Sequence, residues 1–195
     1  MKEHSFEYNT FIGGWYIPEN VCDDLIKYFI DNKAKHISGQ SGKVGNVNEE
    51  VKKCNEMYIG GKIDNNNEII NKYFKNLCQV LNLYLKKYDD ANKTESFSIT
   101  QLVKIQHYNP GDGYYGYHTE NDGFGINRNR HLVFMTYLND VNEGGGTEFK
   151  YQKLISPAKK GLTLIWPAAW THTHRGQVSK TQHKYICTGW YSFNE

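Results

Sequence analysis

RHLVFMTYLNDVNEGGGTEF, residues 130–149, is the stretch that decides the fold class of this chain. Its apolar run at 131–138 has the length and the β-branched and aromatic content of a buried strand. The Gly-rich segment NEGGG at 142–146 then predicts a turn, and a second short strand is expected at 147–151. This stretch therefore indicates a β architecture.

The same pattern continues on both sides of this stretch. Turn signals occur at NPGDG (109–113) and at Lys160–Gly161. Further strands are expected at about 98–108, 114–118, 162–166 and 183–193. Many short strands joined by Gly-rich turns are typical of a jelly roll, the double-stranded β-helix.

The first half of the chain is rich in Asn, Lys, Ile and Tyr and has helical spacing. Pro18 is expected to open a helix at about 19–32, and a second amphipathic helix fits about 67–88. The Gly- and Asn-rich segment 37–56 is predicted to be a loop near the site entrance. These helices are expected to support one side of the jelly roll.

The fold class that follows is α+β, mainly β. No repeat and no long linker divides the 195 residues, so we predict a single domain over 1–195. Its helical support is expected at 1–96 and its jelly-roll core at 97–195.

Composition excludes several classes of protein. No apolar run approaches the roughly 18 residues that cross a bilayer, so no membrane span is expected. The net charge of +2 gives no electrostatic case for nucleic-acid or membrane binding. The N-terminus lacks the features of a signal peptide, which predicts an intracellular, cytoplasmic protein with four free cysteines. We expect it to be a monomer.

Three polar residues form a candidate metal site. His118 and Glu120 are two positions apart, so on a strand both side chains would face the same way, and His174 would come from another strand. Two histidines and one carboxylate leave other metal positions open, which suits non-haem Fe(II). The residues alone leave His172 as an alternative to His174, and Asp122 as a rival to Glu120.

A cation is expected at the buried end of the last strand. Lys184 opens the apolar run YICTGWYSF, ten residues after His174. A buried cation is costly unless it is paired, and a dicarboxylate reaching inward from the metal would pair it. The alternative is an ordinary lysine at the edge of a strand.

Three ordered segments carry these features. VKIQHYNPGDGYYGYHTEN (103–121) holds the HxE pair, and residues 130–149 hold a "YLND…GG.T.F" pattern. LISPAKKGLTLIWPAAWTHTHRGQVSKTQHKYICTGWY (154–191) runs from "P..G..L.F" to the distal histidine, the basic residue and a tryptophan. Together they resemble the 2-oxoglutarate/Fe(II) dioxygenase superfamily, most closely its prolyl 4-hydroxylase-like branch. The resemblance covers about 99–193.

The resemblance implies roles for the matching residues. His118, Glu120 and His174 match the catalytic metal ligands, and Lys184 matches the residue that binds the C5 carboxylate of 2-oxoglutarate. Glu120 departs from the aspartate of the prolyl hydroxylases. Its extra methylene carries the carboxylate about 1.5 Å further unless the side chain folds back.

Three aromatic residues complete the implied site. Tyr108 matches a tyrosine whose hydroxyl contacts the cosubstrate, and Trp190 matches an aromatic residue close to the substrate pocket. Tyr137 is a further candidate for the cosubstrate pocket, with a place in the barrel core as its alternative.

The resemblance implies Fe(II), with 2-oxoglutarate and O₂ as cosubstrates and ascorbate as a further candidate. The expected reaction hydroxylates prolyl residues in a peptide or protein and releases succinate and CO₂. A free amino acid or small metabolite is the alternative substrate. The rival functions are a catalytically silent jelly-roll binding module and a zinc hydrolase that uses the same two histidines.

Overall fold

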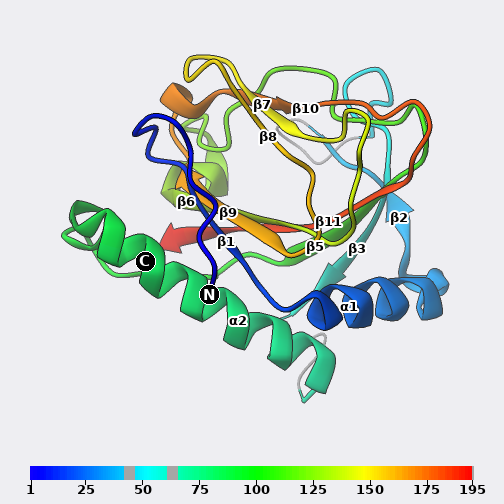
Figure 1. Ribbon diagram of the computed structural model, residues 1–195, viewed down its shortest axis with the longest axis horizontal. Coiled ribbons are helices and arrows are strands. Elements are labelled where there is room, and N and C mark those ends of the chain that lie inside the picture. Colours follow the sequence, from blue (N-terminus) through cyan, green and yellow to red (C-terminus); the bar gives the residue numbers. More distant parts are fainter. Residues whose placement is uncertain (42–46, 61–65, 195) are drawn as a thin grey trace.

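The protein consists of two antiparallel sheets and two helices, and the computed structural model describes residues 1–41, 47–60 and 66–194 (Figure 1). The strands of the larger sheet are β1 (Gly13–Tyr16), β2 (Ile37–Ser38), β3 (Asn55–Ile59), β4 (Phe97–Ser98), β5 (Val103–Tyr108), β6 (Arg130–Tyr137), β9 (Leu162–Pro167) and β11 (Lys184–Phe193). Those of the smaller sheet are β7 (Thr147–Phe149), β8 (Leu154–Ser156) and β10 (His174–Gly176).

The order of the larger sheet is β1-β9-β6-β11-β5-β3-β2, and β4 pairs with β11. The smaller sheet has the order β10-β7-β8. Neither sheet closes on itself, so the predicted jelly roll is present as two open sheets with a core between them. In the described residues, short 3₁₀ helices lie in the connections at Lys33–Lys35, Asp89–Asn92, Gly125–Asn129 and Trp170–His172.

The helices α1 (Glu19–Asp31) and α2 (Glu68–Lys87) confirm the two helical predictions. Pro18 stands at the start of α1, and the Asn67 side chain caps α2 by accepting the first free backbone N–H groups. Both helices lie on the face of the larger sheet away from the smaller sheet (Figure 1). In the described part of the chain, no helix is long and apolar enough to cross a membrane.

Residues of β6 alternate between two apolar clusters, which explains its continuous apolar run. Leu132 and Phe134 pack toward the helices, whereas Val133, Met135 and Tyr137 belong to the cluster between the sheets. Successive side chains of a strand point to opposite faces, and here both faces are covered. The four cysteines are free thiols, as predicted.

The Gly-rich turn after β6 requires its glycines. Gly144 and Gly145 have positive φ angles of 68° and 71°. A Cβ atom on Gly144 would lie 2.3 Å from the carbonyl oxygen of Val178, which is a steric clash. The turn therefore packs directly against the segment that follows β10.

Two predictions about the strands that precede β6 in the sequence are wrong. Residues 114–118 form no strand: Tyr114 and His118 make isolated bridges to Lys52 and His174. The segment also accepts a hydrogen bond from Gly176 at Tyr114, but its contacts with β10 do not form a continuous ladder. The strand expected at 98–108 is broken into β4 and β5, which pair with opposite ends of β11.

The first half of the chain also supplies strands. The predicted loop 37–56 contains β2 and the start of β3, while its residues 42–46 lie outside the described part of the chain. β3 pairs with β5 over five residues, and β1 pairs with β9. The Gly- and Asn-rich residues before β3 indicated a loop, and NEMYI forms a strand because it pairs with β5.

Candidate metal and cosubstrate site

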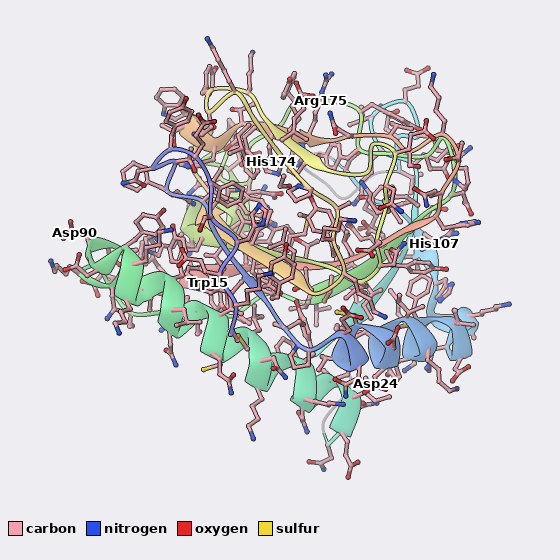
Figure 2. The ribbon with its side chains drawn as sticks, in the orientation of Figure 1. Trp15, Asp24, Asp90, His107, His174 and Arg175 are labelled. Carbon is pink, nitrogen blue, oxygen red and sulfur yellow. The ribbon has the colours of Figure 1, made fainter. Side chains whose placement is uncertain are left out.

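An inner cavity of about 80 Å³ lies between the two sheets. Every residue that the sequence predicted for the site lines this cavity, except Tyr137. β5 and β11 lie side by side in the larger sheet and contribute Tyr108, Lys184 and Trp190. β10 contributes His174, which lies at the smaller sheet (Figure 2). The fold thus gathers residues that are far apart in the sequence.

His118 and His174 are held together by their backbones. The two residues exchange N–H···O hydrogen bonds of 2.9 Å in both directions. Nδ1 of His118 lies 3.1 Å from the Gly116 carbonyl oxygen, and Nδ1 of His174 lies 2.8 Å from the His172 carbonyl oxygen. If each Nδ1 donates, each Nε2 keeps its lone pair for a metal. This pairing replaces the continuous strand that the sequence suggested.

Glu120 completes a set of three donor atoms. Its Oε1 lies 3.5 Å from Nε2 of His118 and 3.6 Å from Nε2 of His174. The three donor atoms all lie within 4.8 Å of one another. Two imidazole nitrogens and one carboxylate oxygen at this separation fit one divalent ion and suit Fe(II).

The other oxygen of Glu120 is held from the outer side of the site. Oε2 accepts a 2.9 Å hydrogen bond from the Trp190 indole and a 3.3 Å contact from Nη1 of Arg130. The Arg130 guanidinium also stacks on Trp190, 3.6 Å from the ring centroid. These contacts fix the longer carboxylate in one orientation, with Oε1 turned toward the histidines.

The electrostatics favour the forms of these groups that bind a metal. Burial lowers the pKa of His118, which keeps the imidazole neutral near pH 7. Burial opposes ionisation of Glu120, but the electrostatic influence of the two adjacent histidines holds the pKa of its carboxyl well below the usual value. Neutral imidazole and ionised carboxylate are the ligand forms.

The two rival residues lie elsewhere. His172 is buried, and its Nε2 contacts the Thr10 carbonyl oxygen at 2.9 Å while its Nδ1 contacts the Thr171 hydroxyl at 3.0 Å. Asp122 is exposed and accepts a 3.0 Å hydrogen bond from the backbone N–H of Phe124. Neither residue belongs to the three-donor cluster.

Lys184 is a buried cation, 6% exposed, at the first position of β11. Its Nζ lies 4.6 Å from the Tyr108 ring centroid and 3.4 Å from the Gln177 carbonyl oxygen. In the described ranges no carboxylate pairs with it, and burial lowers its pKa to about 8. A buried amine without an acidic partner would be paired by one carboxylate of a dicarboxylate ligand. The surroundings of Lys184 therefore fit 2-oxoglutarate.

Tyr108 and Tyr137 occupy different positions relative to the cavity. The Tyr108 hydroxyl donates to Oε1 of Gln106 at 2.8 Å. The Tyr137 hydroxyl lies behind the cavity wall, 2.8 Å from the hydroxyls of Thr147 and Ser156. Thr147 itself lines the cavity. Tyr137 is thus connected to the cavity by its hydrogen bond with the Thr147 hydroxyl and does not line the cavity itself.

Sequence reasoning missed a polar network at the wall formed by β3 and β5. Glu56 is fully buried and pairs with Lys52, and it also accepts a 2.7 Å hydrogen bond from Gln106. Lys104 and Gln106 line the inner cavity together with Tyr108, at alternate positions of β5. The signal was present: Lys104, Gln106 and Tyr108 occupy alternate positions of VKIQHY, so on a strand they share one face, and that face lines the cavity.

A second, outer cavity of about 480 Å³ adjoins the first. The two cavities share five lining residues: Lys104, Tyr114, His118, Glu120 and Trp190. Arg130 and Asp122 line the outer cavity but not the inner one. Two of the three metal donors, His118 and Glu120, therefore lie at the junction of a narrow inner space and a wider outer one, and His174 lines the inner space.

Residues 103–192 match the family model described as the 2OG-Fe(II) oxygenase superfamily. No curated protein matches the sequence significantly. Among solved structures, the viral collagen prolyl hydroxylase of Paramecium Bursaria Chlorella virus-1, as a 2OG complex, is 19% identical with a TM-score of 0.69. The alignment covers 95% of this chain and 98% of that one.

Two further structures have the same fold. A Pseudomonas putida prolyl-4-hydroxylase is 15% identical with a TM-score of 0.70, and the alignment covers 94% of each chain. A Trichoplax adhaerens prolyl hydroxylase, in complex with a hypoxia inducible factor peptide fragment, is 14% identical with a TM-score of 0.72. That alignment covers 94% of this chain and 84% of the other.

Proposed function

We propose that this chain, a 2-oxoglutarate-dependent dioxygenase whose residues 103–192 belong to the 2OG-Fe(II) oxygenase superfamily, hydroxylates prolyl residues in a peptide or protein. Fe(II), 2-oxoglutarate and O₂ follow from the family. The observation that carries the site assignment is one cavity with a two-histidine, one-carboxylate donor set and a buried lysine. The prolyl substrate is supported by the likeness to prolyl hydroxylase structures, one of which holds a peptide.

In this proposal each side chain has a defined task. Nε2 of His118, Nε2 of His174 and Oε1 of Glu120 hold the metal. When bound, Fe(II) with 2-oxoglutarate and O₂ supplies the oxidising chemistry that hydroxylates a C–H bond and yields succinate and CO₂. Trp190 and Arg130 keep the Glu120 carboxylate from rotating.

Lys184 anchors the distal carboxylate of 2-oxoglutarate, with Tyr108 beside it. The wall formed by Met135, Trp166 and Ile186 excludes water from the inner cavity. The peptide then occupies the outer cavity, where it meets the metal at the junction. Binding at two adjoining cavities lets the chain orient both substrates before reaction.

The decisive experiment is an anaerobic titration of the protein with Fe(II) and 2-oxoglutarate, followed by exposure to O₂ with proline-rich peptides. We expect a weak visible charge-transfer band and then stoichiometric succinate with a mass gain of one oxygen in the peptide. Succinate with a free amino acid, but with no peptide, would replace the peptide substrate by a small one. Metal and 2-oxoglutarate binding without any decarboxylation would favour a silent binding module.

Lys184→Ala is expected to raise the apparent KM for 2-oxoglutarate about ten- to a hundredfold. The substitution removes a charge-assisted hydrogen bond worth roughly 1.5–3 kcal/mol, while the three metal donors are untouched. Steady-state succinate formation at varied 2-oxoglutarate measures the change. Iron affinity should stay near the wild-type value.

Lys180→Ala is the matched control, because Lys180 is exposed on the same connection between β10 and β11. The pH dependence of 2-oxoglutarate affinity gives a second readout. The dicarboxylate binds the charged amine, so affinity should be full below pH 8 and fall as pH rises through the Lys184 pKa of about 8. An unchanged KM in Lys184→Ala would remove this lysine from the cosubstrate site.

A further inference from the structure

Lys104 lies at the junction of the two cavities and lines both of them. It is the second residue of β5, where it pairs with Tyr58 of β3 and Thr188 of β11. Its side chain is 14% exposed, and Nζ lies 5.4 Å from the Tyr58 ring and 5.8 Å from the Trp190 ring. The amine is thus enclosed by aromatic walls and faces the space that adjoins the metal donors.

Among the described residues, Glu56 is the carboxylate that contacts Lys104, and it is already engaged. Oε1 of Glu56 pairs with Lys52 and accepts the hydrogen bond of Gln106. Lys104 reaches the other oxygen, Oε2, at 3.5 Å, which is longer than an N–H···O hydrogen bond. Within the described ranges, Lys104 has no closer acidic partner. Its amine therefore retains donors for a second anion.

The charges around the two cavities leave one cation in excess. Three carboxylates contribute to them: Glu56, Glu120 and Asp122. Four cations line the two cavities: Lys52, Lys104, Arg130 and Lys184. Fe(II) and the 2-oxoglutarate dianion cancel each other, so the excess of one positive charge persists in the loaded enzyme.

The pairs identify which cation is left over. Lys52 pairs with Glu56, and Arg130 contacts Glu120. Lys184 is taken by the cosubstrate under the proposed function. Lys104 has only the 3.5 Å contact with Glu56, whose charge Lys52 already neutralises, and it alone of the three lysines lines the outer cavity where the substrate would enter.

We infer that Lys104 forms a subsite for a carboxylate carried by the substrate, close to the carbon that is hydroxylated. This inference rests on the proposed function and narrows its substrate class to an anionic one. The carboxylate belongs either to an acidic residue near the target proline or to the free C-terminus of the substrate. A partly buried lysine between aromatic walls recognises either source through the same charge-assisted hydrogen bond.

The test measures binding to the protein loaded anaerobically with Fe(II) and 2-oxoglutarate. The probes are fluorescent, end-blocked peptides with one central proline, in which Glu replaces Gln in turn at each of three positions on either side. A second pair ends at the proline, with a free or an amidated C-terminus. Fluorescence anisotropy gives the Kd of each peptide without any turnover.

We expect at least one carboxylate peptide to bind about tenfold more tightly than its neutral partner, with the preference decreasing at high salt. The position of the favoured Glu, or the free C-terminus, identifies the source of the carboxylate. Lys104→Met should abolish the preference and Lys104→Arg should retain it. Lys33→Gln, which removes an exposed lysine of the Lys33–Lys35 helix, should keep the wild-type preference.

Equal binding of every matched pair to the wild-type protein would overturn the inference, as would a preference that survives in Lys104→Met. The comparison of peptides on the wild-type protein needs no variant to fold. Failure of the proposed function is separate, because it appears as absent charge-transfer absorption or absent succinate. Because anisotropy needs no turnover, the carboxylate preference at Lys104 can be measured on loaded protein that forms no succinate, and on the unloaded protein if the charge-transfer band is absent.

Discussion

His174→Ala is expected to abolish stoichiometric Fe(II) binding, whereas His172→Ala should largely spare it. Nε2 of His174 lies 3.6 Å from Oε1 of Glu120 and belongs to the three-donor cluster. Removing one of three protein ligands leaves two donors, which is too few to compete with water for Fe(II). Metal content after anaerobic dialysis against Fe(II) measures the effect.

His172 provides the control for this prediction, because it is buried two positions away and contacts Thr10 and Thr171. Its substitution is expected to lower thermal stability, since it leaves the Thr10 carbonyl without its partner. Full iron occupancy in His172→Ala would show that burial alone does not make a ligand here. Iron retained by His174→Ala and lost by His172→Ala would reverse the assignment of the distal ligand.

Glu120→Gln is expected to eliminate succinate formation, while Asp122→Asn should have a mild effect. An amide carries no charge and is a poor ligand for Fe(II). It would also disturb the contacts that Oε2 makes with Trp190 and Arg130. Asp122 is exposed, accepts a hydrogen bond from the backbone of Phe124 and is not part of the donor cluster.

The measurement is succinate release at saturating 2-oxoglutarate and Fe(II), with melting curves to confirm that both variants fold. Glu120→Asp is an informative companion, because its shorter side chain would withdraw Oε2 from the indole of Trp190. We expect Glu120→Asp to retain more turnover than Glu120→Gln, since it keeps the charged ligand. A fatal Asp122→Asn with an active Glu120→Gln would transfer the ligand role to Asp122.

The elements that the sequence predicted well are those whose signal is local. α1 and α2 have apolar stripes and clear starts at Pro18 and Asn67. β6 and β11 are long apolar runs that any covered strand would show. Hydrophobic periodicity and helix capping act over a few residues, so a single sequence contains them in full.

The elements that were missed depend on distant partners. β3 consists of NEMYI, which becomes a strand by pairing with β5, and β1 becomes one by pairing with β9. Residues 114–118 look like a strand, yet Tyr114 and His118 find a single bridge each. Pairing over long sequence separations decides such cases, and local propensity does not.

For the site, the sequence by itself determined the donor types and their order: an HxE pair, a distal histidine and a lysine ten residues later. It left His172 beside His174 and Asp122 beside Glu120. The tertiary structure alone decided which of these side chains converge. The backbone bridge between His118 and His174 joins the connection between β5 and β6 to strand β10 of the smaller sheet.

The tertiary structure alone also brought in Arg130, Lys104 and the buried Glu56. Their positions follow from strand register: β5 lies between β3 and β11, so Lys104 comes beside Tyr58 and Thr188. The sequence gives the charge of a residue, but packing between strands that are distant in the sequence sets partners such as Tyr58 and Thr188 beside Lys104. Whether a cation is neutralised or left free for a ligand is therefore a property of the folded chain, because Coulomb energy depends on distance in space and on burial.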